Sequence, residues 1–513
     1  MSGSVAFSNI PSNLRVPFFY VEFDPSRAAS SAVVQRTLII GQATTTVPAT
    51  PSPEFVESIG WAQQNFGAGS QLANMVAAYR ANDTVGEIWA LPLPDATGST
   101  AASGSIVITG TPTANGTLYL YVNGTLVTVG VATGQTATQI AANVAAAINA
   151  ATTSTAVNAA LTPPVTAAAS AGTVTITANN KGSLGAVPLA LNWRGAKAGE
   201  TTPAGLGVAI TAMSGGATDP SLANIATWLG TEAFDFIVCP YSDVANLGYL
   251  TTTMNDSTGR WSYSSQIFGH VFSARVDTVS DLLTLGTSLN DQHLTIIGYN
   301  ALSPSSAWLR LAARVGSIVP SLKNQPNRPL QTLLAYGVLG EAESDDISFA
   351  NKQSLLSAGI ALEVPSTSGP QVLRMVTTYQ TNKYGVSDTS YLDTETLFQC
   401  MAVTRQLKAA ITTNLPRALL ADDGTRLPAT PADDTPVMVT PTVVRGILIA
   451  EYLILEDLLL TERDDLFAKG LVVQRNSQDA SRLDVLFDPY YVSGLRIFAV
   501  LNQFHLQAQA SEA

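Results

Sequence analysis

Residues 267–299 read IFGHVFSARVDTVSDLLTLGTSLNDQHLTIIGY, and two parts of this stretch have the composition of buried β-strands. These parts are IFGHVFSA (267–274) and LTIIGY (294–299), which are rich in apolar and β-branched residues. The segment between them is predicted as a helix from Thr278 through Leu285. A strand, a helix and a second strand in this order are typical of a mostly parallel sheet that helices cover on both faces.

The same alternation of strands and helices is predicted on the N-terminal side of this unit. In chain order, the predicted elements are the strand RTLIIG (36–41), a helix opening at residues 53–56, a helix opening at residues 70–79, the strand VGEIWAL (85–91), a helix through Ile225 and Leu229, the strand DFIVCP (235–240) and a helix from Asp243. A chain of 513 residues is long enough for two to four domains of roughly 100–200 residues each. We therefore predict an α/β core that begins near residue 33.

Residues 98–216 interrupt this alternation with a different composition. Gly, Ala, Thr and Val dominate there, and the charged residues are Lys181, Arg194, Lys197 and Glu200. Asn123-Gly124 lies between two alternating apolar runs in TLYLYVNGTLVTV, which is a strong signal for a two-residue hairpin. Residues 137–150 have the apolar spacing of one amphipathic helix. We predict a small β-rich domain that is inserted into a surface loop of the α/β core, where insertions are tolerated.

The C-terminal part is predicted to contain strands and long helices. In order, these are the strand QVLRMVTTYQT (371–381), a helix from about Asp393 to Leu415, a helix from Thr440-Pro441 to about Asp465, the strand LDVLFD (483–488) and the strand GLRIFAVLNQFHL (494–506). The longest apolar stretch, residues 446–460, contains Glu451, Glu456 and Asp457. A membrane-spanning helix needs about 20 mostly apolar residues, so we predict a buried helix here.

Both ends of the chain have the composition of strands without a partner. Three prolines punctuate the first 30 residues, and the strand-forming run 16–23 between them contains Pro17, which is tolerated only in an edge strand. Unpaired apolar strands are aggregation hazards unless another sheet edge satisfies their backbone groups. We therefore predict that both ends exchange strands between subunits. The candidate residues for this exchange are Val16, Phe18, Tyr20, Val21, Phe23, Leu495, Ile497, Ala499, Leu501 and Phe504.

The composition restricts the partners of the protein. Charged residues make up 12% of the chain, about half the share of roughly 25% in globular proteins, which indicates that identical neighbours cover much of the surface. The net charge is −12, and the sequence contains no basic run. A direct nucleic-acid partner is therefore not expected. The start has no secretory signal, and we expect the protein to be cytosolic when it is made.

No residue pattern predicts catalysis. His270 and His293 lie at the edges of predicted strands, and we interpret both as structural. Gly286-Thr287-Ser288 is similar to the nucleophile signature of subtilisin-like proteases, but their His-Gly-Thr motif is missing, so Ser288 lacks a predicted base. Cys239 and Cys400 are predicted as reduced core cysteines. The chain contains neither a phosphate-binding glycine motif nor a calcium loop. We predict no enzyme activity, no metal and no cofactor.

The stretch VTTYQTNKYGVSDTSYLDTETLFQCMAVTRQLKAAITTNLPR (376–417) resembles the C-terminal region of Mu-like phage tail sheath proteins. A strand, an Asp-x-Ser-Tyr-Leu-Asp turn (388–393) and a long helix follow one another in both. The insert, with GTPTANGTLYLYVNGTLVTV (110–129), is similar to the protruding domain of the same contractile-tail family of myoviruses. The order of the parts also matches, so the resemblance covers nearly the whole chain.

This resemblance implies a structural role. Family members form hexameric rings that stack in a helical tube around an inner tail tube, and contraction drives this tube through the host envelope during genome delivery. Their α/β cores are similar to subtilisin in fold without its chemistry. Their N- and C-terminal arms donate strands to the C-terminal domain of a neighbouring subunit. The implied partners are other copies of the chain, the inner tail tube protein, and the baseplate and tail terminator proteins, without direct nucleic acid or membrane insertion. The implied location is the virion tail, with the host cytoplasm as the site of assembly.

The predicted domains are an N-terminal arm (1–32), a subtilisin-like α/β sheath core (33–97 and 217–370), an inserted β-rich protruding domain (98–216), an α/β C-terminal sheath domain (371–493) and a C-terminal arm (494–513). Three alternatives remain at this point. The first is the sheath of a tailocin or another contractile injection system, which has the same subunit design. The second is a subtilisin-like hydrolase that would use Ser288. The third is a secreted surface-layer or adhesion protein, which the Thr/Ala/Gly-rich insert suggests and the α/β core disfavours.

Overall fold

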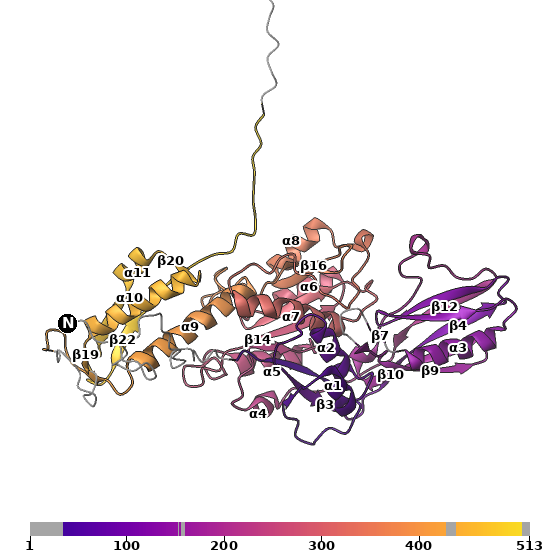
Figure 1. Ribbon diagram of the computed structural model, residues 1–513, viewed down its shortest axis with the longest axis horizontal. Helices are drawn as coiled ribbons and strands as arrows, with labels where there is room; N and C mark the ends of the chain where they lie inside the picture. Colours follow the sequence, from indigo (N-terminus) through magenta and orange to yellow (C-terminus); the bar gives the residue numbers. More distant parts are fainter. Residues whose placement is uncertain (1–33, 152, 155–159, 427–437, 505–513) are drawn as a thin grey trace, which may run out of the picture. The chain divides into compact units, whose positions relative to one another are not determined.

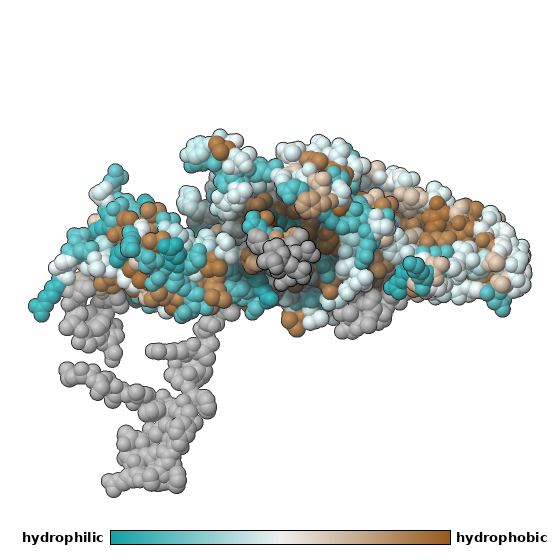
Figure 2. Space-filling model, turned by 90° about the horizontal axis from the view of Figure 1, so that it is seen from above, coloured by the Kyte–Doolittle hydropathy of each residue, from teal (hydrophilic) through white to brown (hydrophobic). Residues whose placement is uncertain are grey.

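The structure is a computed structural model that describes residues 34–151, 153–154, 160–426 and 438–504. Figure 1 and Figure 2 draw the remaining residues in grey. The chain divides into two compact units, residues 1–35 and 36–513. The predicted N-terminal arm (1–32), with Val16, Phe18, Tyr20, Val21 and Phe23, lies outside the described residues. The fold described below belongs to the second unit.

The centre of this unit is an eight-stranded sheet with the order β17-β16-β15-β14-β13-β1-β3-β2. Its strands are β1 (Thr37–Gln42), β2 (Glu54–Phe55), β3 (Ile88–Leu93), β13 (Phe236–Val238), β14 (His270–Val276), β15 (Leu294–Tyr299), β16 (Ile360–Val364) and β17 (Gln371–Arg374). The edge strands β2 and β17 pair antiparallel with their neighbours, and the other strands run parallel. The predicted, mostly parallel sheet is confirmed. Its strand order reverses between β1 and β13, as in doubly wound folds.

Helices cover both faces of this sheet, because successive strand residues point to opposite sides. In β1, Leu38 and Ile40 belong to one buried cluster and Ile39 belongs to the other. The Ile39 face is covered by α2 (Gln71–Arg80) and α7 (Ala307–Asn324). The opposite face is covered by α4 (Ile225–Leu229), α5 (Val244–Met254), α6 (Val279–Thr287) and α8 (Phe349–Ser357).

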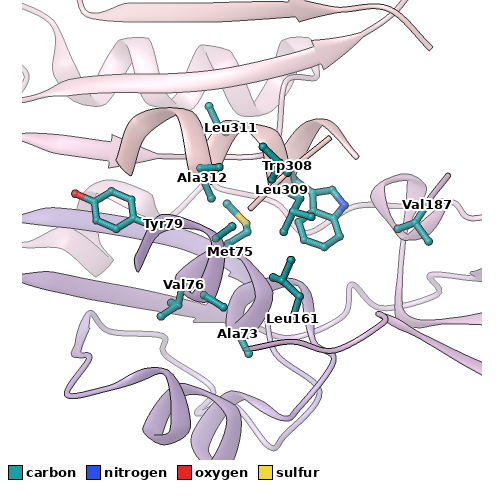
Figure 3. Packing of buried hydrophobic residues seen from close by; sticks show 14 of the residues in the cluster. Ala73, Met75, Val76, Tyr79, Leu161, Val187, Trp308, Leu309, Leu311 and Ala312 are labelled. Atoms are coloured by element: carbon teal, nitrogen blue, oxygen red, sulfur yellow. The ribbon is translucent and has the colours of Figure 1, made fainter. Parts of the chain in front are cut away.

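The helices α2 and α7 pack closely because α7 has a glycine at the contact. Figure 3 shows Met75 of α2 facing Leu309 and Ala312 of α7. A Cβ atom on Gly316 would lie 2.5 Å from the carbonyl oxygen of Tyr79, which is the last-turn backbone of α2. Real side chains essentially never approach backbone this closely, so the contact requires glycine at position 316.

Substituting Gly316 by alanine is expected to destabilise the protein by about 1–3 kcal/mol, because the added methyl group overpacks a backbone contact. Gly446 provides a matched control inside α10 (Pro441–Asp457), since a Cβ atom there meets nothing within 4 Å. Gly446→Ala is expected to stabilise by about 0.5–1 kcal/mol, as alanine favours helix over glycine. Chemical denaturation of both variants measures the difference. Equal shifts of the same sign would contradict the packing described here.

A buried ion network ties α7 to β16. The carboxylate of Glu363 in β16 accepts hydrogen bonds from Arg310 Nη2 at 2.9 Å and from Arg314 Nε at 2.5 Å. Arg310 also pairs with Glu341 at 2.8 Å, and Arg314 Nη2 donates to the carbonyl of Pro370 at 2.8 Å. Both arginines and Glu363 are almost completely buried. Burial raises the pKa of Glu363, but the charges and hydrogen bonds of Arg314 and Arg310 outweigh burial and hold this pKa below its ordinary value.

The insert is built mainly from two antiparallel sheets and one long helix, with a short antiparallel pair formed by β7 (Thr153–Ser154) and β8 (Ala160–Leu161). The four-stranded sheet consists of β12 (Leu206–Ser214), β4 (Ala101–Gly110), β10 (Thr173–Lys181) and β9 (Val165–Ser170), in this order. The three-stranded sheet consists of β11 (Leu189–Leu191), β5 (Gly116–Val122) and β6 (Thr125–Val131). Asn123 and Gly124 join β5 to β6 with φ values of 51° and 78°, so the predicted hairpin is confirmed with the positive φ values that such turns need. The helix α3 (Ala137–Ala150) agrees with its predicted range and packs on the larger sheet (Figure 1).

The insert is hydrogen-bonded to the core on several sides. Asn180 of β10 accepts from the Gln71 backbone at 2.8 Å and donates to the carbonyl of Ala43 at 3.2 Å. Asn74 of α2 exchanges two hydrogen bonds with the backbone of Thr162, at 2.9 and 3.1 Å. Leu161 packs in the same buried cluster as α2, and Figure 3 shows it beside Met75 and Ala73. These contacts fix the insert on α2 and on the end of β1.

The C-terminal part has its own small core, and α9 (Thr394–Asn414) connects this core to the sheet. Near its start, Phe398 stacks on Phe236 of β13 with ring centroids 5.0 Å apart. Further along, Leu407 packs against the C-terminal cluster, in which Tyr452 and Phe467 stack at 3.7 Å. One helix therefore belongs to both cores.

Several predicted elements are wrong in position or extent. Residues 53–56 do not open a helix: Glu54–Phe55 form the edge strand β2, and α1 (Ile59–Phe66) begins after the Ser58 cap. The helix predicted to reach Asp465 ends at Asp457. Leu459 and Arg463 adopt positive φ values of 58° and 64°, which a helix cannot contain, and α11 (Asp464–Gly470) starts afresh.

Other corrections concern length and burial. The strand predicted over residues 371–381 is only β17, and residues 494–504 form no strand within the described chain. The helix predicted as buried is covered along one side only, because Leu453 and Ile454 of α10 are exposed. Between Tyr299 and Gln371 the patterns also missed the helices α7 and α8, the strand β16 and a short 3-10 helix at Glu343–Asp345.

Candidate functional site

The C-terminal arm, residues 494–513, is described up to Phe504 as an extended segment. All five of its predicted exchange residues are exposed, namely Leu495, Ile497, Ala499, Leu501 and Phe504. Within residues 494–504 the backbone forms no ladder with any described strand. Among the described residues, this part of the arm therefore presents apolar side chains together with backbone N–H and C=O groups that pair with no strand, as in a strand without its sheet.

The alternating pattern missed two residues of this arm. Phe498 and Val500 are 82% and 70% exposed, comparable to Ile497 and Leu501 at 76% and 83%. The arm is thus apolar on both faces. A signal for this existed in the sequence, since residues 497–501 are a continuous apolar run, and such a run is typical of a strand covered on both faces.

A two-stranded sheet in the C-terminal part has two open edges. It consists of β21 (Val472–Arg475) and β22 (Leu483–Leu486), which pair antiparallel with each other and with no further strand in the described chain. Val473 and Leu483 pack against the cluster that contains Tyr452, and this fixes one face. On the other face, Val472 and Leu486 are directly opposite each other and both are exposed.

Exposed apolar residues also gather on the nearby helix. Leu453 and Ile454 of α10, and Leu458 and Leu459 just after it, are exposed although they are large and apolar. Figure 2 shows apolar residues interspersed with hydrophilic ones on the face in view. Clusters of this kind on a single subunit mark interaction surfaces.

The two histidines have structural partners. His270 is fully buried, its Nε2 atom lies 2.8 Å from the hydroxyl of Thr295, and burial lowers its pKa. His293 Nε2 lies 3.0 Å from Asp256 Oδ1, and the imidazole ring packs on Trp261 with centroids 4.5 Å apart. These contacts fit the structural interpretation of both residues.

Ser288 is the C-cap of α6. Its hydroxyl donates to the carbonyl of Leu285 at 2.7 Å. The C-terminal end of a helix carries a partial negative charge, so this position disfavours the oxyanion that forms during hydrolysis. The resemblance of Gly286-Thr287-Ser288 to a protease signature therefore does not extend to its surroundings.

Cys239 and Cys400 are free, as expected. Cys239 is buried, and burial raises its pKa to about 12. Cys400 is only half-buried, so the prediction of a core cysteine is wrong for this residue, and burial raises its pKa as well.

Among residues 34–504 with their gaps, no group of three or more His, Cys, Asp or Glu side chains is placed to hold a metal ion. None of the described helices has both the length and the apolar character needed to cross a bilayer.

A cavity of about 740 Å³ lies at the carboxyl edge of the large sheet. It is lined by residues that follow β13 and β15, such as Tyr241 and Asn300, by the end of β14 at Val276, and by residues 183–184, 186–190 and Trp193 of the insert. Ligands of doubly wound sheets bind outside this edge. Here the insert covers part of it, since Gln42 at the end of β1 donates to the Lys181 carbonyl at 2.8 Å.

Comparison with known proteins defines the class. Residues 215–378, which include β13 to β17, match the family described as phage tail sheath protein central domain. The protein is thus a tail sheath protein, a structural component of the contractile tail of a phage or a related injection system. Over 509 residues it is 33% identical to the Mu-like prophage FluMu tail sheath protein of Haemophilus influenzae, covering 98% of this chain and 100% of that relative. The chain belongs to the family of Mu-like phage tail sheath proteins.

Solved sheath structures are similar at lower identity. The sheath tail protein of Desulfitobacterium hafniense is 9% identical, with a TM-score of 0.45 and coverage of 93% of this chain and 100% of that one. The sheath complex of an extracellular contractile injection system, PVC, in its contracted state is 10% identical, with a TM-score of 0.46 and coverage of 96% and 98%.

Proposed function

We propose that this chain polymerises as hexameric rings, which stack into a helical tube around an inner tail tube and contract to drive that tube through the host envelope. The observation that carries the proposal is the C-terminal arm, an extended apolar segment that no strand of the described chain covers. In this proposal the subunit binds further copies of itself, the inner tail tube protein, and the baseplate and tail terminator proteins. It is assembled in the host cytoplasm and becomes part of the virion tail.

The C-terminal arm fits the open edges of the β21–β22 sheet on another copy. At about 3.3 Å per residue, the segment 497–504 spans about 26 Å, roughly twice the length of a four-residue strand. It can therefore pair along the whole edge of β21 or β22, each of which has four residues. The pairing satisfies backbone groups on both chains and covers Val472, Leu486 and the apolar side chains of the arm. The N-terminal arm, by the same proposal, uses the second edge.

Contraction in this account draws its free energy from contacts between subunits. Subunits that slide and rotate while their arms stay paired bury more surface in the short state, and interfaces of this kind bury on the order of 1,000 Å² or more. A modest gain in each subunit is multiplied by the number of subunits in the tube. A nucleotide requirement for contraction would contradict this account.

We also propose that the α/β core is related to subtilisin in fold, with its catalytic function absent. The parallel sheet with helices on both faces supports the relationship in fold. The position of Ser288 at the C-terminal end of α6 supports the absence of the catalytic function. The sheath of a tailocin or another contractile injection system would use the same subunit design, so the proposal covers those assemblies too.

Negative-stain electron microscopy of the purified full chain at high concentration tests the proposal. We expect stacked rings or hollow striated tubes, formed without nucleotide. A chain that stays monomeric at every salt concentration would contradict the proposal, because the exposed arm would then have no partner in a second copy.

A further inference from the structure

One side chain in the exposed C-terminal arm is held in place. Arg496 is only 14% exposed, although its neighbours Leu495 and Ile497 are mostly exposed. Its Nε atom lies 3.1 Å from Asp393 Oδ2, and its Nη1 atom lies 3.0 Å from Glu395 Oε1. Both carboxylates belong to the start of α9, where Asp393 is the N-cap and Glu395 is in the first turn. The arm is therefore attached to the body at one defined residue.

Asp393 and Glu395 differ in whether they keep a cationic partner when Arg496 is removed. Asp393 also accepts two contacts from Arg374, at 2.8 and 3.0 Å, so it keeps a cation without Arg496. Glu395 is 2% exposed, and burial raises its pKa. Among the described residues, its other hydrogen-bond partner outside α9 is the backbone N–H of Leu330 at 3.0 Å. Removing Arg496 would leave a buried carboxylate without its ion pair, which is strongly unfavourable.

The backbone before Arg496 is also fixed. A Cβ atom on Gly494 would lie 2.4 Å from Cγ of Pro329, so the chain passes this proline at a distance that only glycine permits. Upstream, β23 (Tyr490–Tyr491) pairs with β20 (Thr461–Glu462), and the backbone N–H of Val492 donates to the carbonyl of Leu460 at 3.3 Å. Residues 490–496 therefore belong to the body, and residues 497–504 make no such contacts in the described chain.

We propose that Arg496, held between Asp393 and Glu395, is the anchor at which the C-terminal arm pivots. The free arm then begins at Ile497, and its length and starting point are set by this ion pair. A neighbouring subunit that holds the arm would pull on the first turn of α9, the helix that belongs to both cores. The role of the anchor in a tube rests on the proposed function, but the anchor itself is a property of the single subunit.

Limited chymotrypsin digestion of the unassembled subunit, followed by intact mass measurement of the C-terminal fragments, tests the anchor. In the wild-type protein we expect early cleavage after the exposed Phe498, Leu501 and Phe504. Tyr490 and Tyr491 are expected to be protected by the backbone pairing of β23 with β20, although the Tyr490 side chain is 39% exposed. In Arg496→Gln, cleavage after Tyr490 and Tyr491 is expected to be about tenfold faster, since this factor corresponds to about 1.4 kcal/mol, the scale of one hydrogen bond. Unchanged cleavage rates would overturn the proposal.

Three further variants keep this test specific. Arg496→Lys retains the charge and should restore most of the protection. Glu395→Gln removes one partner of Arg496 but leaves an acceptor for Leu330, and it should give an intermediate rate. Arg482→Gln removes an exposed ion pair with Asp484 and should digest like wild type. Digestion of Arg482→Gln at the rate of Arg496→Gln would mean that the effect is not specific to the anchor.

Electron microscopy of assembled Arg496→Gln separates the anchor from the proposed function. We expect this variant to form tubes with irregular ring spacing. Without the ion pair, the residue at which the arm leaves the body differs from subunit to subunit, so the length of the free arm differs as well. Regular tubes together with faster cleavage after Tyr490 would overturn the role of the anchor in assembly. If wild-type protein forms no tubes while the digestion result holds, the proposed function fails and the anchor in the single subunit remains.

Discussion

Deletion of residues 497–513 is expected to abolish tube formation and to leave the subunit folded. The described part of this segment, residues 497–504, is exposed and forms no ladder with the described strands, so its removal takes no packing or sheet pairing from the body. The same removal takes away the strand that we propose to join neighbouring subunits. Negative-stain electron microscopy measures tube formation, and thermal unfolding of the unassembled subunit measures folding.

The matched control is the deletion of residues 507–513, which read QAQASEA. This change removes a similar chain end but keeps the apolar segment up to Leu506, so tubes are expected to persist. Regular tubes from the chain that lacks residues 497–513 would show that the arm is not the link between subunits. Loss of tubes in the control as well would assign the link to residues 507–513 instead.

Substitution of Glu363 by alanine is expected to lower the free energy of unfolding by about 3–5 kcal/mol, because it leaves Arg310 and Arg314 buried without their shared carboxylate. Arg310 would keep Glu341, whereas among the described residues Arg314 would keep neutral partners such as the carbonyl of Pro370. Chemical denaturation of the unassembled subunit measures the loss. As the control, Arg482→Ala removes an exposed ion pair with Asp484 and should change stability by about 0–1 kcal/mol.

The pH dependence of the same variant gives a second readout. The folded-state pKa of Glu363 lies below its ordinary value of 4.5. The stabilisation from this carboxylate is therefore fully present above about pH 4.5 and is lost as the pH falls through the lower folded-state pKa. The stability difference between wild type and Glu363→Ala should accordingly narrow below pH 4.5. A difference that stays constant down to acid unfolding would contradict the ionised state of Glu363.

Elements with strong local signals could be predicted from the sequence. The helix α3 agrees with its predicted range because its apolar spacing is regular and Thr136 with Gln139 forms a capping box. The hairpin at Asn123-Gly124 was predictable because the two residues tolerate the positive φ values that the turn needs. The strand β15 was predicted at its observed bounds, since a short apolar run bounded by polar residues is typical of a buried parallel strand.

Elements that depend on distant contacts were missed. The helix α7 is buried on nearly all sides although it contains Pro320 and two buried arginines, residue types that argue against a buried helix. Arg310 and Arg314 are tolerated inside because Glu363 approaches from a strand about fifty residues further along the chain. The edge strand β2 has only two residues, too few for any periodic signal.

In the candidate site, too, features with a local sequence signal could be predicted and features that depend on distant contacts could not. The apolar arm was recognisable because apolar residues concentrate near the end of the chain, and the structure describes those in residues 495–504 as exposed. Arg496 gave no signal, because its partners Asp393 and Glu395 precede it by about a hundred residues and only the fold brings them together. The hydrogen bonds of Asn74 and Asn180 across the insert were hidden for the same reason.

The most direct test of strand exchange is an electron cryo-microscopy structure of tubes assembled from the full chain. The account predicts that residues 497–504 of one subunit pair with the open edge of β21 or β22 in a neighbouring subunit, and that Arg496 stays bound to Asp393 and Glu395 of its own subunit. Density that shows the arm folded back on its own subunit, with both edges of the β21–β22 sheet unpaired in the tube, would contradict it.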